Sequence, residues 1–185
     1  MAKREDISAD LVRQLLDYDP ETGVFTYKAR KPEQFKGGEH SAIHTCNKWN
    51  SRCAGSVAGS VAGRGHIDIA INRVNYRAHR LAWLYVYGKW PENGVDHIDG
   101  NPANNRLSNL RDATQAQNMR NAKKYRTNAT GEKNVGFDKR RGLYHLSFTI
   151  DGTQRHFAYY ETLEEARRDR DVVGPAVFGE WWRNG

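Results

Sequence analysis

Apolar and polar residues alternate most regularly in the last third of the chain. Residues 143–150 place apolar side chains at every second position, namely Tyr144, Leu146, Phe148 and Ile150. This period of two predicts a strand with one packed face and one polar face. Shorter segments at 135–138 and 154–159 predict two more strands, joined by Arg-Arg-Gly and Asp-Gly-Thr turns. The pattern therefore predicts a small three-stranded antiparallel sheet.

A helix is predicted to follow this sheet and to pack on it. Thr162 and Glu165 have the spacing of a capping box, which marks a helix start. The apolar residues that can cover the sheet are Leu163, Ala166 and Val173. Gly174-Pro175 then interrupts the pattern, because proline removes an N–H donor and clashes with the preceding turn. The sequence leaves open whether the helix continues beyond this point.

The first two thirds of the chain combine short elements with polar stretches. A serine cap and spaced leucines predict a helix over 8–17, and a strand is expected at 24–28. Residues 28–64 are polar and glycine-rich, so a loop is predicted in their middle. Residues 74–83 predict a strand and then a short helix that opens at His79-Arg80, with one apolar face formed by Leu81, Leu84 and Tyr85.

Residues 95–120 carry a motif with fixed spacing. A short strand is predicted at 95–98, a turn at 99–102, an asparagine-rich loop up to 109 and a helix over 114–122. Asp96 stands directly before His97 in the strand. Asn109 follows His97 by twelve residues, and Asn118 follows it by twenty-one. Order, residue type and spacing together distinguish this segment from an ordinary turn.

The motif resembles that of the HNH endonucleases, specifically the phage and intron-encoded homing type in which the third position is asparagine. The segment from Val74 to Trp83, followed by Gly88-Lys89-Trp90-Pro91, resembles the part that precedes the motif in that subfamily. The resemblance implies an α+β fold with a ββα-metal nuclease core. It also implies cleavage of DNA phosphodiesters to a 5′-phosphate and a 3′-hydroxyl, and a loop-supporting role for Asn109 in the catalytic set.

The chemistry of phosphodiester hydrolysis explains these residue types. A neutral imidazole is available near pH 7 to take a proton from water, so His97 is the candidate general base. A hard divalent ion prefers oxygen ligands, which Asp96 and Asn118 offer. One Mg²⁺ or Mn²⁺ ion per site is therefore expected, with no organic cofactor. His79 has two interpretations, a residue that orients a group near the metal or a core or helix-start residue; the second is favoured, and His79 is not placed in the catalytic set.

Structural interpretations stand beside this one. Asp-Gly beside Asn-Pro is a common turn signal, and a histidine next to an aspartate is often a surface pair. Neighbours on a strand also point to opposite faces, so Asp96 and His97 share one site only if the strand ends or bends there. The alternative function is a catalytically inert, sequence-specific DNA-binding regulator.

The C-terminal pattern resembles the Apetala/ethylene-response-factor type of DNA-binding domain. The segments 134–142, 160–166 and 178–180 carry the resemblance, although Tyr144 stands where tryptophan is usual. In that family the polar face of the sheet enters the major groove. The DNA-contacting residues expected here are Arg120, Lys123, Lys124, Arg126, Lys139, Arg140, Arg141, His145, Ser147, Thr149 and Arg155.

Composition narrows the partner and the setting. The 185 residues include 29 Lys plus Arg and 22 Asp plus Glu, a net charge of +7, which favours a polyanion such as double-stranded DNA. The charge is densest over 120–141, where a solvated linker is the alternative interpretation. A zinc site at His40, His44, Cys46 and Cys53 is not favoured, because their spacing contains no Cys-x-x-Cys pair.

Three regions are expected: an N-terminal region over 1–64, a nuclease core over 65–124 and a DNA-binding domain over 125–185. Two cysteines provide no disulfide framework, and no apolar run approaches the ~20 residues of a membrane span. An intracellular, monomeric enzyme in the cytoplasm of a phage-infected cell is therefore expected.

Overall fold

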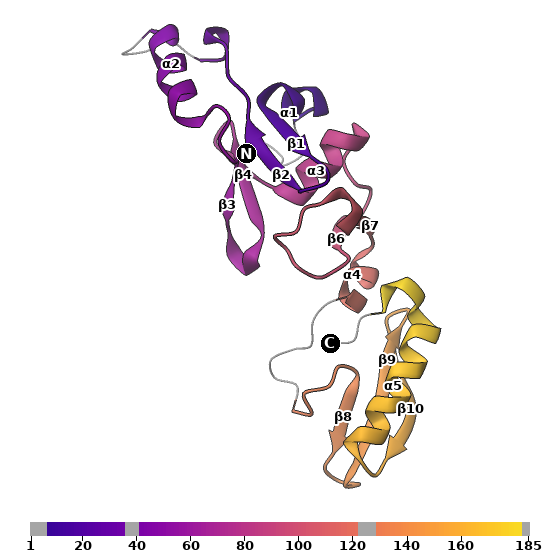
Figure 1. The fold of residues 1–185 in the computed structure, drawn as a ribbon. Coiled ribbons are helices and arrows are strands. Elements are labelled where there is room, and N and C mark those ends of the chain that lie inside the picture. The colour runs from indigo at the N-terminus through magenta and orange to yellow at the C-terminus, as the bar shows by residue number, and fades with distance from the viewer. Residues whose placement is uncertain (1–6, 36–40, 122–128, 183–185) are drawn as a thin grey trace. The chain divides into compact units, whose positions relative to one another are not determined.

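The chain folds into two compact units. A computed structural model describes residues 7–35, 41–121 and 129–182. One unit spans Met1–Asp112 and the other Ala113–Gly185 (Figure 1). Each combines helices with small antiparallel sheets, which confirms the expected α+β class.

The first unit opens with a helix and a hairpin. Helix α1 (Ala9–Leu15) begins where the Ser8 hydroxyl accepts a hydrogen bond from the Leu11 N–H at 3.2 Å. Strands β1 (Leu16–Asp19) and β2 (Val24–Tyr27) pair antiparallel. The predicted helix therefore ends two residues early, because Leu16 and Asp17 pair with β2 instead of continuing the helical turn.

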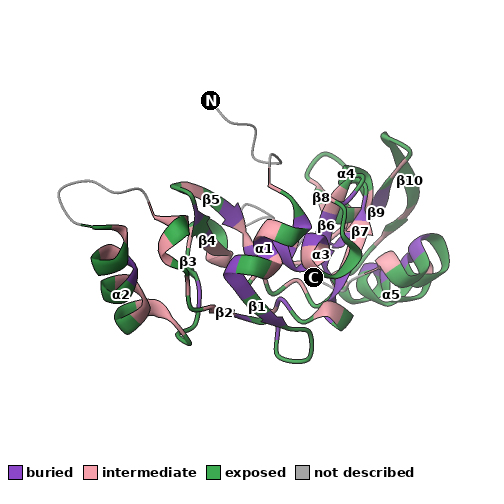
Figure 2. Ribbon diagram, turned by 90° about the horizontal axis from the view of Figure 1, so that it is seen from above, coloured by how far each residue is buried: buried purple, intermediate pink, exposed green. Residues whose placement is uncertain are grey.

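The loop predicted in the middle of residues 28–64 is wrong, because this stretch contains helix α2 (Ala42–Cys53). It follows a 3₁₀ turn at Pro32–Gln34 and begins at Ser41, whose hydroxyl accepts from the His44 N–H. Asn50 fastens α2 through hydrogen bonds to both backbone groups of Arg30. The helix is mostly exposed, and its half-buried face carries the apolar residues Ala42, Cys46, Trp49 and Cys53, which sequence analysis overlooked among the many polar residues of this segment (Figure 2).

A second sheet leads into the helix that precedes the motif. Strands β3 (Ser60–Val61), β4 (Ile67–Ile71) and β5 (Val74–Arg77) form an antiparallel sheet in that order, with a 3₁₀ turn at Gly63–Gly65. Helix α3 (Ala78–Tyr87) follows directly, as predicted, and ends at Gly88 in the left-handed conformation.

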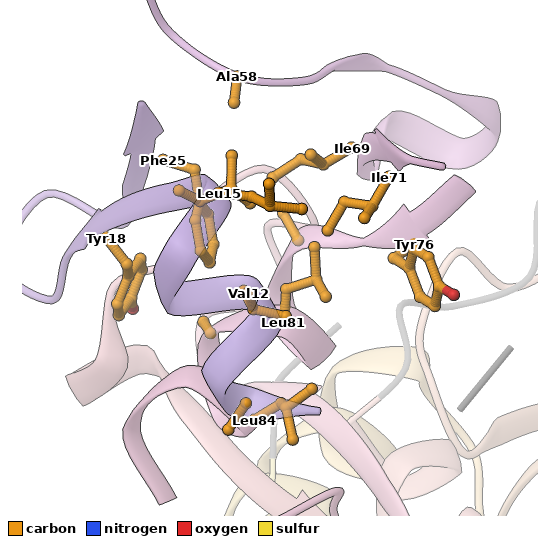
Figure 3. Close-up of a cluster of buried hydrophobic side chains, with 14 of the residues drawn as sticks. Val12, Leu15, Tyr18, Phe25, Ala58, Ile69, Ile71, Tyr76, Leu81 and Leu84 are labelled. Carbon is orange, nitrogen blue, oxygen red and sulfur yellow. The ribbon is translucent and has the colours of Figure 1, made fainter. Parts of the chain in front are cut away.

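One hydrophobic core joins these elements. Val12 and Leu15 of α1 lie beside Leu81 of α3, and Ile69 of β4 closes the cluster from another side (Figure 3). Leu81 and Ile69 are fully buried, so the core fixes α3 on the sheet. The first residues of α3 are thereby held in place, which matters for the candidate site.

The motif forms a two-stranded sheet with a long loop. Strand β6 (Gly94–His97) pairs with β7 (Leu110–Ala113), and a 3₁₀ turn at Leu107–Asn109 precedes β7. The hairpin β1–β2 supports this loop from outside. The Tyr18 hydroxyl donates to the Asn105 carbonyl at 2.7 Å, and the Leu107 N–H donates to the Pro20 carbonyl at 3.0 Å.

The second unit contains helix α4 (Gln115–Asn121) and the predicted sheet. Strands β8 (Val135–Asp138), β9 (Leu143–Ile150) and β10 (Thr153–Tyr160) form an antiparallel sheet in the order β10-β9-β8. Helix α5 (Leu163–Phe178) packs on one face, and a 3₁₀ turn at Gly179–Trp181 follows. The sheet packed on one helix is thus confirmed.

Helix α5 continues through Pro175, which answers the question that the sequence left open. Gly174 leaves room for the Trp182 ring against the helix, because a Cβ at residue 174 would lie 2.3 Å from that ring. Three residues after the proline, Phe178 packs edge-on against Phe148 and stacks on Trp182. Aromatic packing on both sides of Pro175 therefore offsets the lost backbone hydrogen bond.

The contact between the β1–β2 turn and the motif loop gives the first prediction. Gly23 has φ +74°, and a Cβ there would lie 2.4 Å from the Arg106 backbone nitrogen. Gly23→Ala should lower the free energy of unfolding by more than the roughly 1–2 kcal/mol that a left-handed alanine costs by itself. Urea unfolding of the purified variant measures this.

Gly55→Ala is the matched control. Gly55 has φ +78° but no atom within 4 Å of the added methyl group, so only the conformational cost applies there. Equal decreases in the free energy of unfolding of the two variants would mean that the β1–β2 turn does not pack closely against the motif loop.

Candidate active site

His97 ends strand β6 and is buried, with 6% of its surface exposed. Its Nε2 atom lies 3.3 Å from Oδ1 of Asn105, whose own Nδ2 donates to the Ala103 carbonyl. With the carboxamide oriented by this second bond, its oxygen faces the ring, and the contact assigns the proton of the neutral ring to Nε2 of His97. The lone pair of the neutral ring is then on Nδ1.

Burial lowers the pKa of His97 below its ordinary value, and the hydrogen bond to Asn105 together with the charges of Asp99 and Asp96 opposes the shift. Desolvation disfavours the charged imidazolium, so the ring is neutral near pH 7. A buried neutral imidazole with a defined tautomer has the state that a general base requires.

Two further histidines lie against His97. The rings of His79 and His97 meet edge-on with centroids 4.8 Å apart, and His66 lies 5.2 Å from His79 and 5.9 Å from His97. One ring nitrogen from each residue lies within 4.8 Å of the other two. Within the described parts of the chain, this histidine trio (His66, His79 and His97) is a group that could hold a metal ion.

The histidines of this trio are uncharged. Burial, followed by the neighbouring histidines, lowers the pKa of His79 to about 3. Burial and then the charge of Arg77 lower the pKa of His66. The Nδ1 atoms of His66 and His79 are buried with no hydrogen-bond partner. Two neighbouring buried nitrogens without a hydrogen-bond partner are unusual, because each unsatisfied polar atom costs about 1–3 kcal/mol.

His66 was not selected from the sequence, although a signal for it exists. Strands β4 and β5 are joined by a two-residue turn at Asn72 and Arg73, both with positive φ, and pair Asp68 with Arg77. His66 and His79 each lie two residues beyond this last pair of the ladder, so the hairpin places them near each other although neither belongs to a strand.

Asp96, the neighbour of His97, contacts a different group. Its carboxylate accepts hydrogen bonds from both Nε and Nη2 of Arg111 on β7, at 3.0 and 2.9 Å. Both side chains are largely buried, so this is a desolvated ion pair in which the Arg111 charge offsets that of Asp96. The two neighbours follow the alternation expected of a strand.

Asn109 closes the motif loop with its side chain. Oδ1 accepts from the Asp99 backbone N–H at 3.0 Å, while Nδ2 donates to the Asp99 carboxylate at 3.0 Å and to the Asn104 carbonyl at 2.8 Å. Its own carbonyl accepts from the Ile98 N–H. The residue is buried, and its contacts are those that a loop-supporting role needs.

Asn118 lies on α4 in the second unit, and its N–H donates to the Thr114 carbonyl at the start of that helix. Its predicted role as a metal ligand remains a prediction. Arg120 on the same helix lies over the Phe178 ring and near the Asp151 carboxylate. The predicted DNA contacts Lys123, Lys124 and Arg126 lie outside the described residues.

The open face of the C-terminal sheet, opposite α5, brings together three of the predicted DNA contacts. Directly paired residues point to the same face, and His145, Ser147 and Thr149 pair with Tyr159, His156 and Gln154. Arg141, in the β8–β9 turn with Lys139 and Arg140, lies over the Tyr159 ring at 4.6 Å. Sequence analysis did not name His156 and Tyr159.

Arg155 does not join this group. It pairs with Phe148, whose side chain packs under α5, so Arg155 leaves the sheet on the opposite face. On the open face, Gly136 makes room for His145, because a Cβ there would lie 2.3 Å from its ring. The imidazole of His145 therefore lies across the sheet beside His156, with centroids 4.8 Å apart.

The alternative zinc site has no support among the described residues. His44, Cys46 and Cys53 belong to no group of potential metal ligands there, and His40 is not described. Cys46 is buried, with its sulfur 3.1 Å from the Arg30 carbonyl.

Comparison with known proteins agrees with the motif. A family model described as HNH endonuclease matches residues 76–120. Protein 3.8 of Escherichia phage T7 is 36% identical over 89 residues, which are 48% of this chain and 74% of the phage protein. An uncharacterized HNH endonuclease of Acanthamoeba polyphaga mimivirus is 30% identical over 121 residues, which are 64% of this chain and 62% of the viral protein. The chain belongs to the HNH endonuclease family.

The matched region contains His79, Asp96, His97 and Asn109, but it ends before the C-terminal sheet. No solved structure shows a significant match to the chain. In the described part of the chain, no helix has the length and apolar character needed to cross a membrane.

The Asn109 hydrogen bonds give the second prediction. Asn109→Ala removes an acceptor from the Asp99 N–H and two donated bonds, so the free energy of unfolding should fall by about 1–3 kcal/mol. The exchange of the Asp99 amide hydrogen should also accelerate, because its acceptor is lost. Hydrogen exchange followed by NMR measures both the site and the global effect.

Asn101→Ala serves as the control, since the Asn101 side chain accepts only one exposed bond, from the Ala103 N–H. Unchanged protection of Asp99 in Asn109→Ala would contradict the loop-closing role.

Proposed function

We propose that this protein is a metal-dependent DNA endonuclease of the homing or nicking type, in which His97 is the general base. The single observation that carries the proposal is the buried, neutral His97 ring, whose Nε2–H is directed to Asn105 and whose lone pair is on Nδ1. Family membership supports the same reaction class.

Each residue has a defined task in this proposal. Nδ1 of His97 takes a proton from the attacking water, and Asn105 holds the resulting imidazolium through the Nε2–H bond. The water then attacks phosphorus, the P–O3′ bond breaks, and the departing 3′-oxygen takes up a proton from solvent, which gives a 5′-phosphate and a 3′-hydroxyl. Asn109 keeps the loop that carries Asn105 in shape through its bonds to Asp99 and Asn104.

The oxygen donors suit a hard cation. Asp96 and Asn118 are the proposed ligands for one Mg²⁺ or Mn²⁺ ion, which would stabilise negative charge on the phosphate and on the leaving oxygen. The assignment of Asp96 as a ligand rests on its place in the motif beside His97, and its carboxylate already pairs with Arg111. The assignment of Asn118 as the second ligand rests on its position in the sequence motif.

The partner proposed for the second unit is double-stranded DNA. The open face of its sheet presents imidazole, hydroxyl and guanidinium groups, which suit contacts with phosphates and base edges. The Apetala/ethylene-response-factor-like assignment and the domain limits at 64 and 124 belong to this proposal, and a monomer is proposed. The similarity to a phage T7 protein supports a phage origin.

One observation favours the alternative of an inert DNA-binding regulator. Asp96 is neutralised by Arg111, and a neutralised carboxylate attracts a cation less strongly. The two functions differ in one measurement, because a regulator binds DNA without nicking it under any divalent metal.

The third prediction concerns cleavage of supercoiled plasmid carrying the native target with Mg²⁺ or Mn²⁺. His97→Ala should reduce the rate by about 10²–10⁴-fold, because the general base is lost. His44→Ala, a substitution of an exposed histidine on α2, should leave it near the wild-type value. Equal rates for His97→Ala and wild type would eliminate His97 as the base.

The fourth prediction concerns DNA binding. Arg141→Ala should weaken the binding of target duplex and reduce the slope of log K against log salt by about 1, because one phosphate contact is lost. Arg155→Ala, on the face of the sheet that packs on α5, should change the slope much less. Fluorescence anisotropy over a salt series measures this, and a larger effect of Arg155→Ala would place the DNA on the other face.

A further inference from the structure

The ligand atoms of the histidine trio suit a different class of metal ion from the Mg²⁺ or Mn²⁺ proposed for catalysis. It offers only imidazole nitrogens, which suit zinc, nickel, copper and cobalt ions, whereas Mg²⁺ prefers oxygen. Three imidazoles leave a fourth tetrahedral position for water. A transition-metal ion is therefore the ligand class that this cluster selects.

The geometry is close to that of a bound ion. Zinc–nitrogen distances of about 2.0–2.1 Å in a tetrahedron imply ligand separations of roughly 3.4 Å. The ring nitrogens of the trio lie within 4.8 Å of one another, so they would have to approach by at most about 1.4 Å to bind an ion. The core that holds α3 on β4 keeps His79 in position for this.

Two observations point to a ligand independently of that spacing. The buried Nδ1 atoms of His66 and His79 have no hydrogen-bond partner, which a metal or a coordinated water would satisfy. His79 is also 93% buried, as its exposed fraction is 7%, so bulk water does not supply the missing partner. Neutral rings, rather than imidazolium ions, are the form that binds metals.

The consequence for catalysis follows from His97, which belongs to both sites. Its Nε2–H is directed to Asn105, so its lone pair is on Nδ1. One lone pair cannot bind a metal ion and accept a proton from water at the same time. We propose that Zn²⁺ or a similar transition-metal ion binds His66, His79 and His97 and inhibits the nuclease by occupying its general base.

The inhibition rests on the proposed function, whereas metal binding does not, so binding is tested first. The full-length, metal-free protein is titrated with Co²⁺, whose visible spectrum reports imidazole coordination. One ion should bind per chain. His66→Ala should weaken binding by more than the roughly 10–100-fold typical for the loss of an outer-shell partner. Circular dichroism and urea unfolding verify that this variant is folded.

Two control variants exclude other ligands. His44→Ala removes a histidine outside the trio, and Cys53→Ser removes the less buried thiol. Both should bind Co²⁺ as the wild type does. Absence of a cobalt spectrum in the wild type, or a spectrum unchanged in His66→Ala, would overturn the proposed site.

The second arm measures plasmid nicking with Mg²⁺ at increasing Zn²⁺, normalised to the Mg²⁺-dependent rate of each variant. Wild type should be inhibited more than tenfold at Zn²⁺ concentrations that saturate the trio, and His66→Ala should need higher Zn²⁺. Stimulation by Zn²⁺, or equal inhibition of both proteins, would overturn the inhibitory role. Cobalt binding without any nicking would refute the nuclease and leave the metal site standing.

Discussion

The Asn109 carboxamide closes the loop between β6 and β7. The tautomer of His97 that the proposed general base needs depends on that closure. The closed loop carries Asn105, and the Asn105 oxygen fixes the proton of His97 on Nε2. Tyr18 holds the Asn105 carbonyl from the other side, although it lies 87 residues away in the chain. The protonation state of one ring is therefore set by a hairpin, a loop and a strand end, which explains why a nuclease motif needs the N-terminal segment around it.

Strand alternation separates the two neighbours at the centre of the motif. Asp96 points to Arg111 on β7, whereas His97 points to His79 and Asn105. The charge of Arg111 offsets that of Asp96, so the Asp96 carboxylate raises the pKa of His97 less than burial lowers it. Burial consequently dominates the pKa of His97, and the ring is neutral near pH 7, as the proposed general base requires.

Sequence analysis succeeded where periodicity or motif spacing was strong. It predicted β8 and β9 with their observed limits and a short helix opening at His79-Arg80, which the structure has as α3. It missed α2, because the few apolar residues of this helix lie among many polar ones, and it missed His66, which lies outside the strands and meets His79 only in the folded chain. Asn105 lacked a signal of its own among several asparagines, since its role depends on the carboxamide orientation that Ala103 imposes. Which side chains contact one another depends on the tertiary fold. A single sequence predicts such a contact only where the arrangement of the elements can be inferred.

The burial that suits His97 to the proposed role of general base is also the basis of the proposed inhibition by a transition metal. An exposed histidine would be partly charged near neutral pH and would bind metals weakly, because water competes for both its proton and its lone pair. Desolvation removes that competition for His66, His79 and His97 together. Three neutral rings in contact with one another offer nitrogen lone pairs that suit a borderline cation. In this chain His66 and His79 lie against the ring of the proposed base, so the proposed metal site and the proposed catalytic site share His97.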